Sequence, residues 1–184
     1  MRVLLTLILI CSGLISTALA DDSLHFALTD QNGRIVSEAD YRGRPLLLTF
    51  GYTFCPDVCP TSLQTIAAAV DRLGTEGERV RFALVTVDPQ RDTPEHLAGY
   101  VALFHPRLQG LTGSEKAIAA IARQLKVRYA KVVIRPEDPD GYGMDHTSSF
   151  FLVGANGRLA ARLPHSLSVE ALAERIARHL KGGA

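Results

Sequence analysis

The sequence has no excess charge of either sign. Its formal net charge is +1 at pH 7, with 20 basic against 19 acidic residues. The missing basic excess argues against nucleic-acid binding, and the missing acidic tail argues against a disordered, solvating segment. Internal repeats and low-complexity stretches are also absent. Hydrophobic residues make up 47% of the 184 residues, which is typical of one soluble domain with a proper core. Any specificity must therefore lie in a local site.

Cysteine is scarce as well, with only three in the chain. Cys11 lies inside an apolar N-terminal run, and Ile10 before it is not the small residue that usually precedes a lipidated cysteine. The other two, Cys55 and Cys59, are only four positions apart. A structural disulfide stabilises most when it closes a long loop, so this spacing favours redox or metal chemistry.

The N-terminal segment is typical of an export signal. Arg2 gives a positive start, residues 3–19 are almost wholly apolar, and Ala18-Leu19-Ala20 matches the A-x-A cleavage pattern. We predict that residues 1–20 form a secretory signal peptide. An uncleaved membrane anchor is the alternative, because the run is close to the roughly 17 to 20 residues that span a bilayer. Export would place the cysteines where disulfides can persist.

Apolar patterning predicts strands alternating with helices. Expected β-structure comprises a hairpin over 24–36, strands at 46–50 and 80–87, and a hairpin over 150–163. Expected helices lie at 61–73, after Thr93-Pro94, from Ser114 to Leu125, and at 168–180. This order predicts an α/β fold with a central mixed sheet flanked by helices, plus a hairpin or loop insertion near 131–145. A cysteine pair between the first core strand and the first helix is the thioredoxin arrangement.

The segment Cys55-Pro56-Asp57-Val58-Cys59-Pro60 has the chemistry of a site. If it is helical, the two cysteines face the same side, and a nearby helix N-terminus lowers a thiol pKa. The thiolate is the form that binds metals and attacks disulfides, so both uses are open. Two inert buried cysteines would be the alternative, but a loop flanked by prolines disfavours it.

His146 is a third candidate. Reducing thioredoxin-like proteins carry C-x-x-C and a proline opposite the cysteines. Here the spacing is C-x-x-x-C, and His146 lies in a proline-free stretch between Pro139 and Pro164. Two thiolates and one imidazole suit copper and also zinc, although zinc usually takes a fourth ligand. The other histidines are expected to cap or to form hydrogen bonds: His25, His96, His105, His165 and His179.

Three segments resemble the hallmark motifs of the Sco/SenC family. They are Cys-Pro-Asp-Val-Cys-Pro at 55–60, Val-Asp-Pro-Gln-Arg-Asp-Thr-Pro-Glu at 87–95, and Asp-His-Thr at 145–147. The likeness extends over about 24–180. Members of this family are copper-binding, thioredoxin-like proteins that help to assemble the dinuclear copper (CuA) site of cytochrome c oxidase. The resemblance implies that Cys55, Cys59 and His146 hold one copper ion, Cu(I) or Cu(II), and that 21–184 form a thioredoxin-like copper-binding domain.

The resemblance also implies a function. We expect a metallochaperone of the bacterial periplasm, soluble or tethered to the inner membrane, that delivers copper to the CuA site or prepares its thiols. Its partner would be cytochrome c oxidase subunit II, with other copper chaperones and a thioredoxin-like reductant as further partners. The alternatives are a thiol:disulfide oxidoreductase with Cys55 and Cys59 as its redox pair, or a redox or copper sensor. A peroxidase is the weakest hypothesis, because no peroxidatic motif is present. His146 favours the chaperone, since a reductase needs no third ligand.

Five residues near these motifs leave their roles open: Asp57, Asp88, Arg91, Asp92 and Asp145. The segment 88–95 has a complete structural interpretation as a strand end, an Asp-Pro turn and a capped helix, which we prefer. Arg91 and Asp92 could also contact a partner or the cysteine loop. Asp57 and Asp145 could orient the ligands, or be solvated loop carboxylates.

Overall fold

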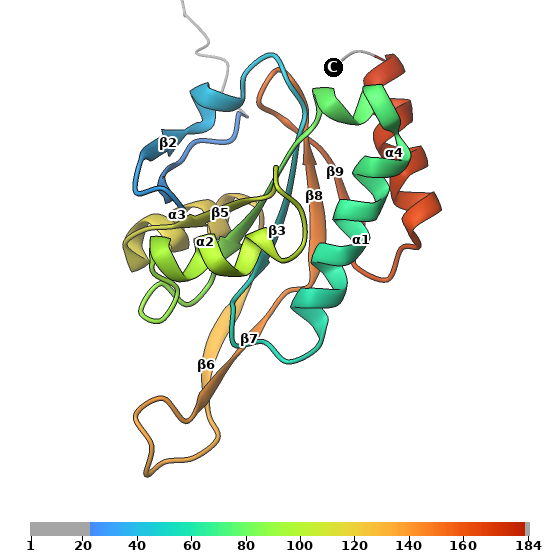
Figure 1. Cartoon of the computed structure of the whole chain (residues 1–184). Coiled ribbons are helices and arrows are strands. Elements are labelled where there is room, and N and C mark those ends of the chain that lie inside the picture. Colours follow the sequence, from blue (N-terminus) through green and yellow to red (C-terminus); the bar gives the residue numbers. More distant parts are fainter. Residues whose placement is uncertain (1–22, 183–184) are drawn as a thin grey trace, which may run out of the picture.

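A computed structural model describes residues 23–182, so the predicted signal peptide and Cys11 lie outside the described residues. A mixed seven-stranded sheet in the order β2-β1-β5-β4-β3-β8-β9 forms the centre (Figure 1). The three middle strands β5, β4 and β3 are parallel, and the remaining pairs are antiparallel. The strands are β1 (Ala27–Asp30), β2 (Ile35–Ser37), β3 (Leu46–Gly51), β4 (Arg81–Thr86), β5 (Gln109–Thr112), β8 (Ser149–Val153) and β9 (Leu159–Pro164).

Helices cover both faces of this sheet, as the alternation of elements predicts. They are α1 (Val58–Arg72), α2 (Pro94–Ala102), α3 (Glu115–Gln124) and α4 (Val169–Gly182), with 3-10 turns η1 (Glu38–Tyr41) and η2 (Gly74–Arg79). The predicted cap at Thr93 is confirmed, because its side chain accepts a hydrogen bond from the His96 backbone N–H. Ser114 caps α3 in the same way. Within residues 23–182, no helix has the length and apolar character needed to cross a bilayer.

The core lies on both sides of the sheet because neighbouring strand residues point to opposite faces. In β3, Leu46 and Leu48 pack into the cluster that contains α3, whereas Leu47 packs into the cluster that contains α1 and α4. All three are at most 1% exposed. Burial on both faces explains why this strand is a continuous apolar run.

A second, two-stranded sheet carries the candidate ligand His146. It consists of β6 (Tyr129–Val133) and β7 (Tyr142–His146), and it projects from the body of the molecule (Figure 1). The expected insertion near 131–145 is therefore confirmed as a hairpin that begins two residues earlier. The expected element order omitted β5, however. That strand has only four residues, Gln-Gly-Leu-Thr, which is too short to show a period.

Candidate metal centre

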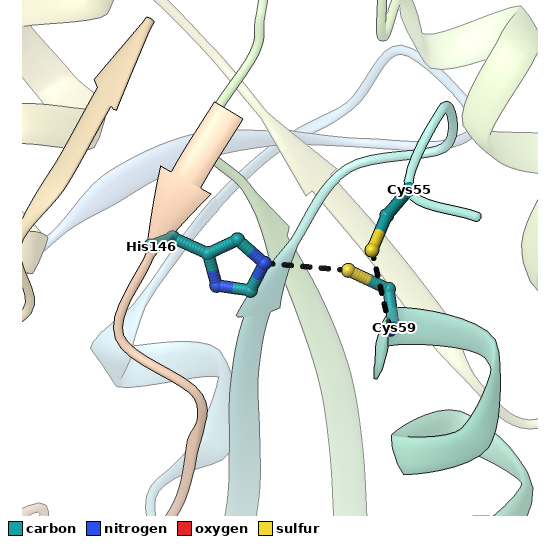
Figure 2. Close-up of side chains that lie close together, drawn as sticks. All are labelled: Cys55, Cys59 and His146. Atoms are coloured by element: carbon teal, nitrogen blue, oxygen red, sulfur yellow. Dashed lines mark hydrogen bonds between the residues drawn. The ribbon is translucent and has the colours of Figure 1, made fainter. Parts of the chain in front are cut away.

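Three side chains from separate elements converge at one end of the sheet. Cys55 comes from the loop after β3, Cys59 from the first turn of α1, and His146 from the end of β7 (Figure 2). Their ligand atoms all lie within 4.8 Å of one another. The Cys59 Sγ lies 3.4 Å from the His146 Nε2, and the Cys59 backbone N–H donates to the Cys55 Sγ at 3.4 Å. Both cysteines are free thiols.

The sequence allows a helix that contains both cysteines, but the structure places only Cys59 in a helix. The helix α1 begins at Val58, three residues before the expected start, and so includes Cys59. Cys55 lies outside it, in a turn where its backbone N–H donates to the Tyr52 carbonyl at 3.3 Å. The two sulfurs therefore approach because the loop folds back onto the helix N-terminus. Helical i, i+4 spacing is not the cause.

Gly51 gives Cys59 the space it occupies. A Cβ at this position would lie 2.9 Å from the Cys59 Sγ, closer than real Cβ atoms approach, and 3.1 Å from a Leu84 methyl group, which is a tight contact. Cys59 is only 3% exposed, so its sulfur has little room to move away. The last residue of β3 must therefore lack a side chain for the buried cysteine to face the centre.

We expect Gly51→Ala to destabilise the fold by about 1–3 kcal/mol, the usual cost of overpacking a core, and to weaken metal binding. The added methyl group would displace the Cys59 Sγ. Urea unfolding and a metal titration measure the two effects. Gly99→Ala is the matched control, since Gly99 lies in α2 and a Cβ at this position would meet no atom within 4 Å. Wild-type stability and affinity in Gly51→Ala would contradict this packing argument.

The imidazole of His146 is oriented for ligation through Nε2. Its Nδ1 lies 3.3 Å from the Thr147 carbonyl oxygen. A proton on Nδ1 that is donated to this carbonyl leaves the Nε2 lone pair directed toward the sulfurs. The edge of the ring contacts Tyr52, with centroids 6.1 Å apart. These contacts hold the ring with its Nε2 facing the Cys59 Sγ.

The two thiols differ in acidity. A hydrogen bond from the Cys59 thiol lowers the pKa of Cys55, and His146 and backbone N–H groups add to this effect against the opposing cost of burial. The same interaction with Cys55, together with burial, raises the pKa of Cys59. Cys55 is therefore the more acidic thiol of the metal-free pair. Metal binding would displace the thiol protons.

The other candidate residues lie outside this group of three. Asp57 and Asp145 are exposed, and neither carboxylate is hydrogen-bonded to Cys55, Cys59 or His146, which favours solvated carboxylates. Three of the remaining histidines form the hydrogen bonds expected of them: His25 with Glu38, His96 with the Arg91 carbonyl, and His105 with Asp71.

The donor set fits a soft metal ion, because two sulfurs and one imidazole favour copper or zinc over hard cations. The SCO1/SenC family model matches residues 17–181. The chain belongs to the SCO1/SenC family. It is 39% identical to the mitochondrial SCO2 homolog of Bos taurus over 158 residues, which cover 84% of this chain and 58% of that protein. The chain thus spans little more than half the length of its bovine relative.

Solved structures of the family agree with the fold. The copper-bound structure of Bradyrhizobium japonicum ScoI has a TM-score of 0.77 and 38% identity, over 85% of this chain and 98% of that one. BsSco, a member of the Sco family of cytochrome c oxidase assembly proteins with an identified disulfide switch, has a TM-score of 0.67 and 25% identity, over 86% and 94%. The predicted thioredoxin-like fold is confirmed. The assignment of individual ligands stays a prediction.

Proposed function

We propose that this SCO1/SenC protein is a copper metallochaperone that loads the CuA site of cytochrome c oxidase subunit II. Cys55, Cys59 and His146 would hold one copper ion. The observation that carries the proposal is the convergence of these three ligand atoms within 4.8 Å, in a chain similar to a ScoI solved with copper bound. Copper(I) accepts two thiolates and one imidazole without a fourth ligand.

The proposal includes a place in the cell envelope. Residues 21–184 would form the copper-binding domain, and residues 1–20 would direct its export to the bacterial periplasm, with or without cleavage. The support is the charged start, the apolar run and the A-x-A pattern of that segment. A CuA site that receives copper outside the cytoplasm requires a donor in the same compartment.

Thiol:disulfide exchange is the second candidate function. It is favoured by the lowered pKa of Cys55, a residue that is less buried than Cys59, and these properties suit a thiolate that attacks a partner disulfide. The disulfide switch identified in BsSco supports a redox role for Cys55 and Cys59 in this chain. Copper and a disulfide would exclude each other, because both consume the same two thiolates.

We expect the reduced chain to bind about one copper per molecule, since three ligands form one site, and the oxidised chain to bind none tightly. Anaerobic titration of both forms, with thiol counting, measures this difference. The loaded chain is then mixed with the copper-free CuA domain of subunit II, and copper is quantified after the proteins are separated. Tight binding by the oxidised form would contradict the shared site. Copper that never leaves the reduced chain would contradict the chaperone function.

A further inference from the structure

The hairpin that carries His146 needs side-chain contacts to hold its direction. The strands β6 and β7 form their own sheet and have no ladder hydrogen bonds to the central one. The backbone anchors the hairpin only at its base. Before β6 the anchor is the buried residue Val127, and after β7 it is the strand β8. The tilt of the hairpin, and with it the distance from His146 to the cysteines, depends on what packs against β7.

Arg91 is one of the residues that join β7 to the body. Its side chain is only 9% exposed. Its Nη1 donates to the backbone carbonyls of Asp140 and Tyr142, at 3.2 and 3.1 Å. Its guanidinium group lies over the ring of Tyr142, 3.6 Å from the centroid, and 4.5 Å from that of Phe54, next to Cys55. One side chain therefore contacts both the hairpin and the cysteine loop.

Asp88 holds this arginine in place. Its Oδ2 accepts from the Arg91 Nε at 2.5 Å, and its Oδ1 accepts from the Tyr142 hydroxyl group at 3.0 Å. Asp88 is 3% exposed. A buried carboxylate that is bound by both an arginine and a tyrosine restrains both side chains, because the loss of either hydrogen bond leaves a buried charge with fewer partners.

The neighbouring Asp92 binds the other ligand-bearing segment. It is fully buried, and it accepts hydrogen bonds from the Thr53 hydroxyl group at 2.6 Å and from the Thr53 backbone N–H at 3.1 Å. Thr53 lies two residues before Cys55. Asp92 also accepts from the Thr86 hydroxyl group at the end of β4. The short segment 88–92 thus contacts the cysteine loop through one carboxylate and the histidine hairpin through the arginine.

We propose that Arg91 is a positioning residue that holds the β6–β7 hairpin against the cysteine loop, so that His146 reaches a metal ion bound by Cys55 and Cys59. The inference rests on the proposed function, since it needs His146 as a ligand. It assigns to Arg91 an effect on copper that acts through His146 and leaves the thiols unchanged. Asp92, in contrast, acts on the cysteine side.

A double-mutant cycle tests this route. Arg91→Met should weaken Cu(I) binding about tenfold to hundredfold, the usual loss for a partner that orients a ligand. In a His146→Ala background the same change should cause no further loss. Affinity is measured by competition with a chromophoric Cu(I) chelator. The electron paramagnetic resonance spectrum of the Cu(II) form should lose nitrogen coupling in Arg91→Met, which a general loss of stability would not cause.

Two further variants separate positioning from folding. Arg91→Met leaves the buried charge of Asp88 without its ion-pair partner. The double variant Asp88→Asn/Arg91→Met removes both charges, and it is therefore measured as well. Arg135→Met is the matched control, since this exposed hairpin arginine pairs with Asp138 at the tip. In the metal-free protein, hydrogen exchange over 142–146 should quicken in both Arg91 variants and stay unchanged in Arg135→Met.

The outcomes distinguish this inference from the proposed function. If His146→Ala left Cu(I) affinity unchanged, the ligand set would be wrong, and the inference would fail with it. If His146→Ala weakened binding but Arg91→Met did not, only the inference would be overturned, and packing of Met144 and Tyr129 on the core would suffice to place the hairpin. Equal losses in both backgrounds would also overturn it, because Arg91 would then act on the cysteines.

Discussion

Replacing Cys55 and Cys59 together with alanine should abolish tight copper binding. The remaining imidazole is a single ligand on a half-buried hairpin residue, which cannot hold Cu(I) alone. The loss should exceed the roughly tenfold to hundredfold cost of removing a partner that only orients a ligand. Competition with a Cu(I) chelator measures it. The corresponding double serine variant is the matched control for shape, and it should fail equally, because a hydroxyl group is a harder and weaker donor than a thiolate.

The two single substitutions should differ in their structural cost. Cys59 is buried against Gly51, so Cys59→Ala leaves a small void in the core. Cys55 is only partly buried, in a loop, and Cys55→Ala should cost less stability than Cys59→Ala. Urea unfolding separates these effects from the copper measurement. Stoichiometric, tight copper in a folded double variant would contradict the site altogether.

Much of the candidate metal centre could be predicted because the residues that indicate it are close together in the sequence. The cysteine spacing, the two prolines and the apolar strand before them lie within a short stretch of sequence. They suffice to place a thiol pair at the N-terminus of a helix. The start of α1 at Val58, and the position of Cys55 outside it, could not be predicted, since they depend on how the loop folds over Tyr52.

The contacts that support the centre are long-range, and no periodicity reports them. Asp92 binds Thr53 across 39 positions, and Arg91 binds the Tyr142 carbonyl across 51. The interpretation of 88–95 as a turn and a capped helix was correct but incomplete, because the carboxylate and the guanidinium group point inward. The short strand β5 was missed for a similar reason. It is defined by its pairing with β4 and β1, and its own sequence does not indicate a strand.

His146→Ala should separate the two leading functions. The variant should lose copper retention, because the Nε2 atom that faces the Cys59 Sγ at 3.4 Å is gone. Cys55 and Cys59 should still form and break their disulfide, since the hydrogen bond that the Cys59 thiol donates, the main cause of the lowered pKa of Cys55, persists. Chelator competition and thiol-exchange kinetics measure the two properties. His165→Ala, at an exposed histidine outside the centre, is the matched control and should retain both.

In cells that lack the wild-type protein, the same variant decides between the functions. A chaperone must carry copper, so His146→Ala should fail to restore copper loading of the oxidase, whereas His165→Ala should restore it. A reductase needs only the dithiol pair, so His146→Ala would then restore loading well. The variant must first be shown to be folded and exported at wild-type levels, because His146 lies three residues before the buried strand β8. Given that control, full restoration by His146→Ala would overturn the chaperone function and assign the protein to thiol reduction, since the cysteines would then suffice without a metal-binding histidine.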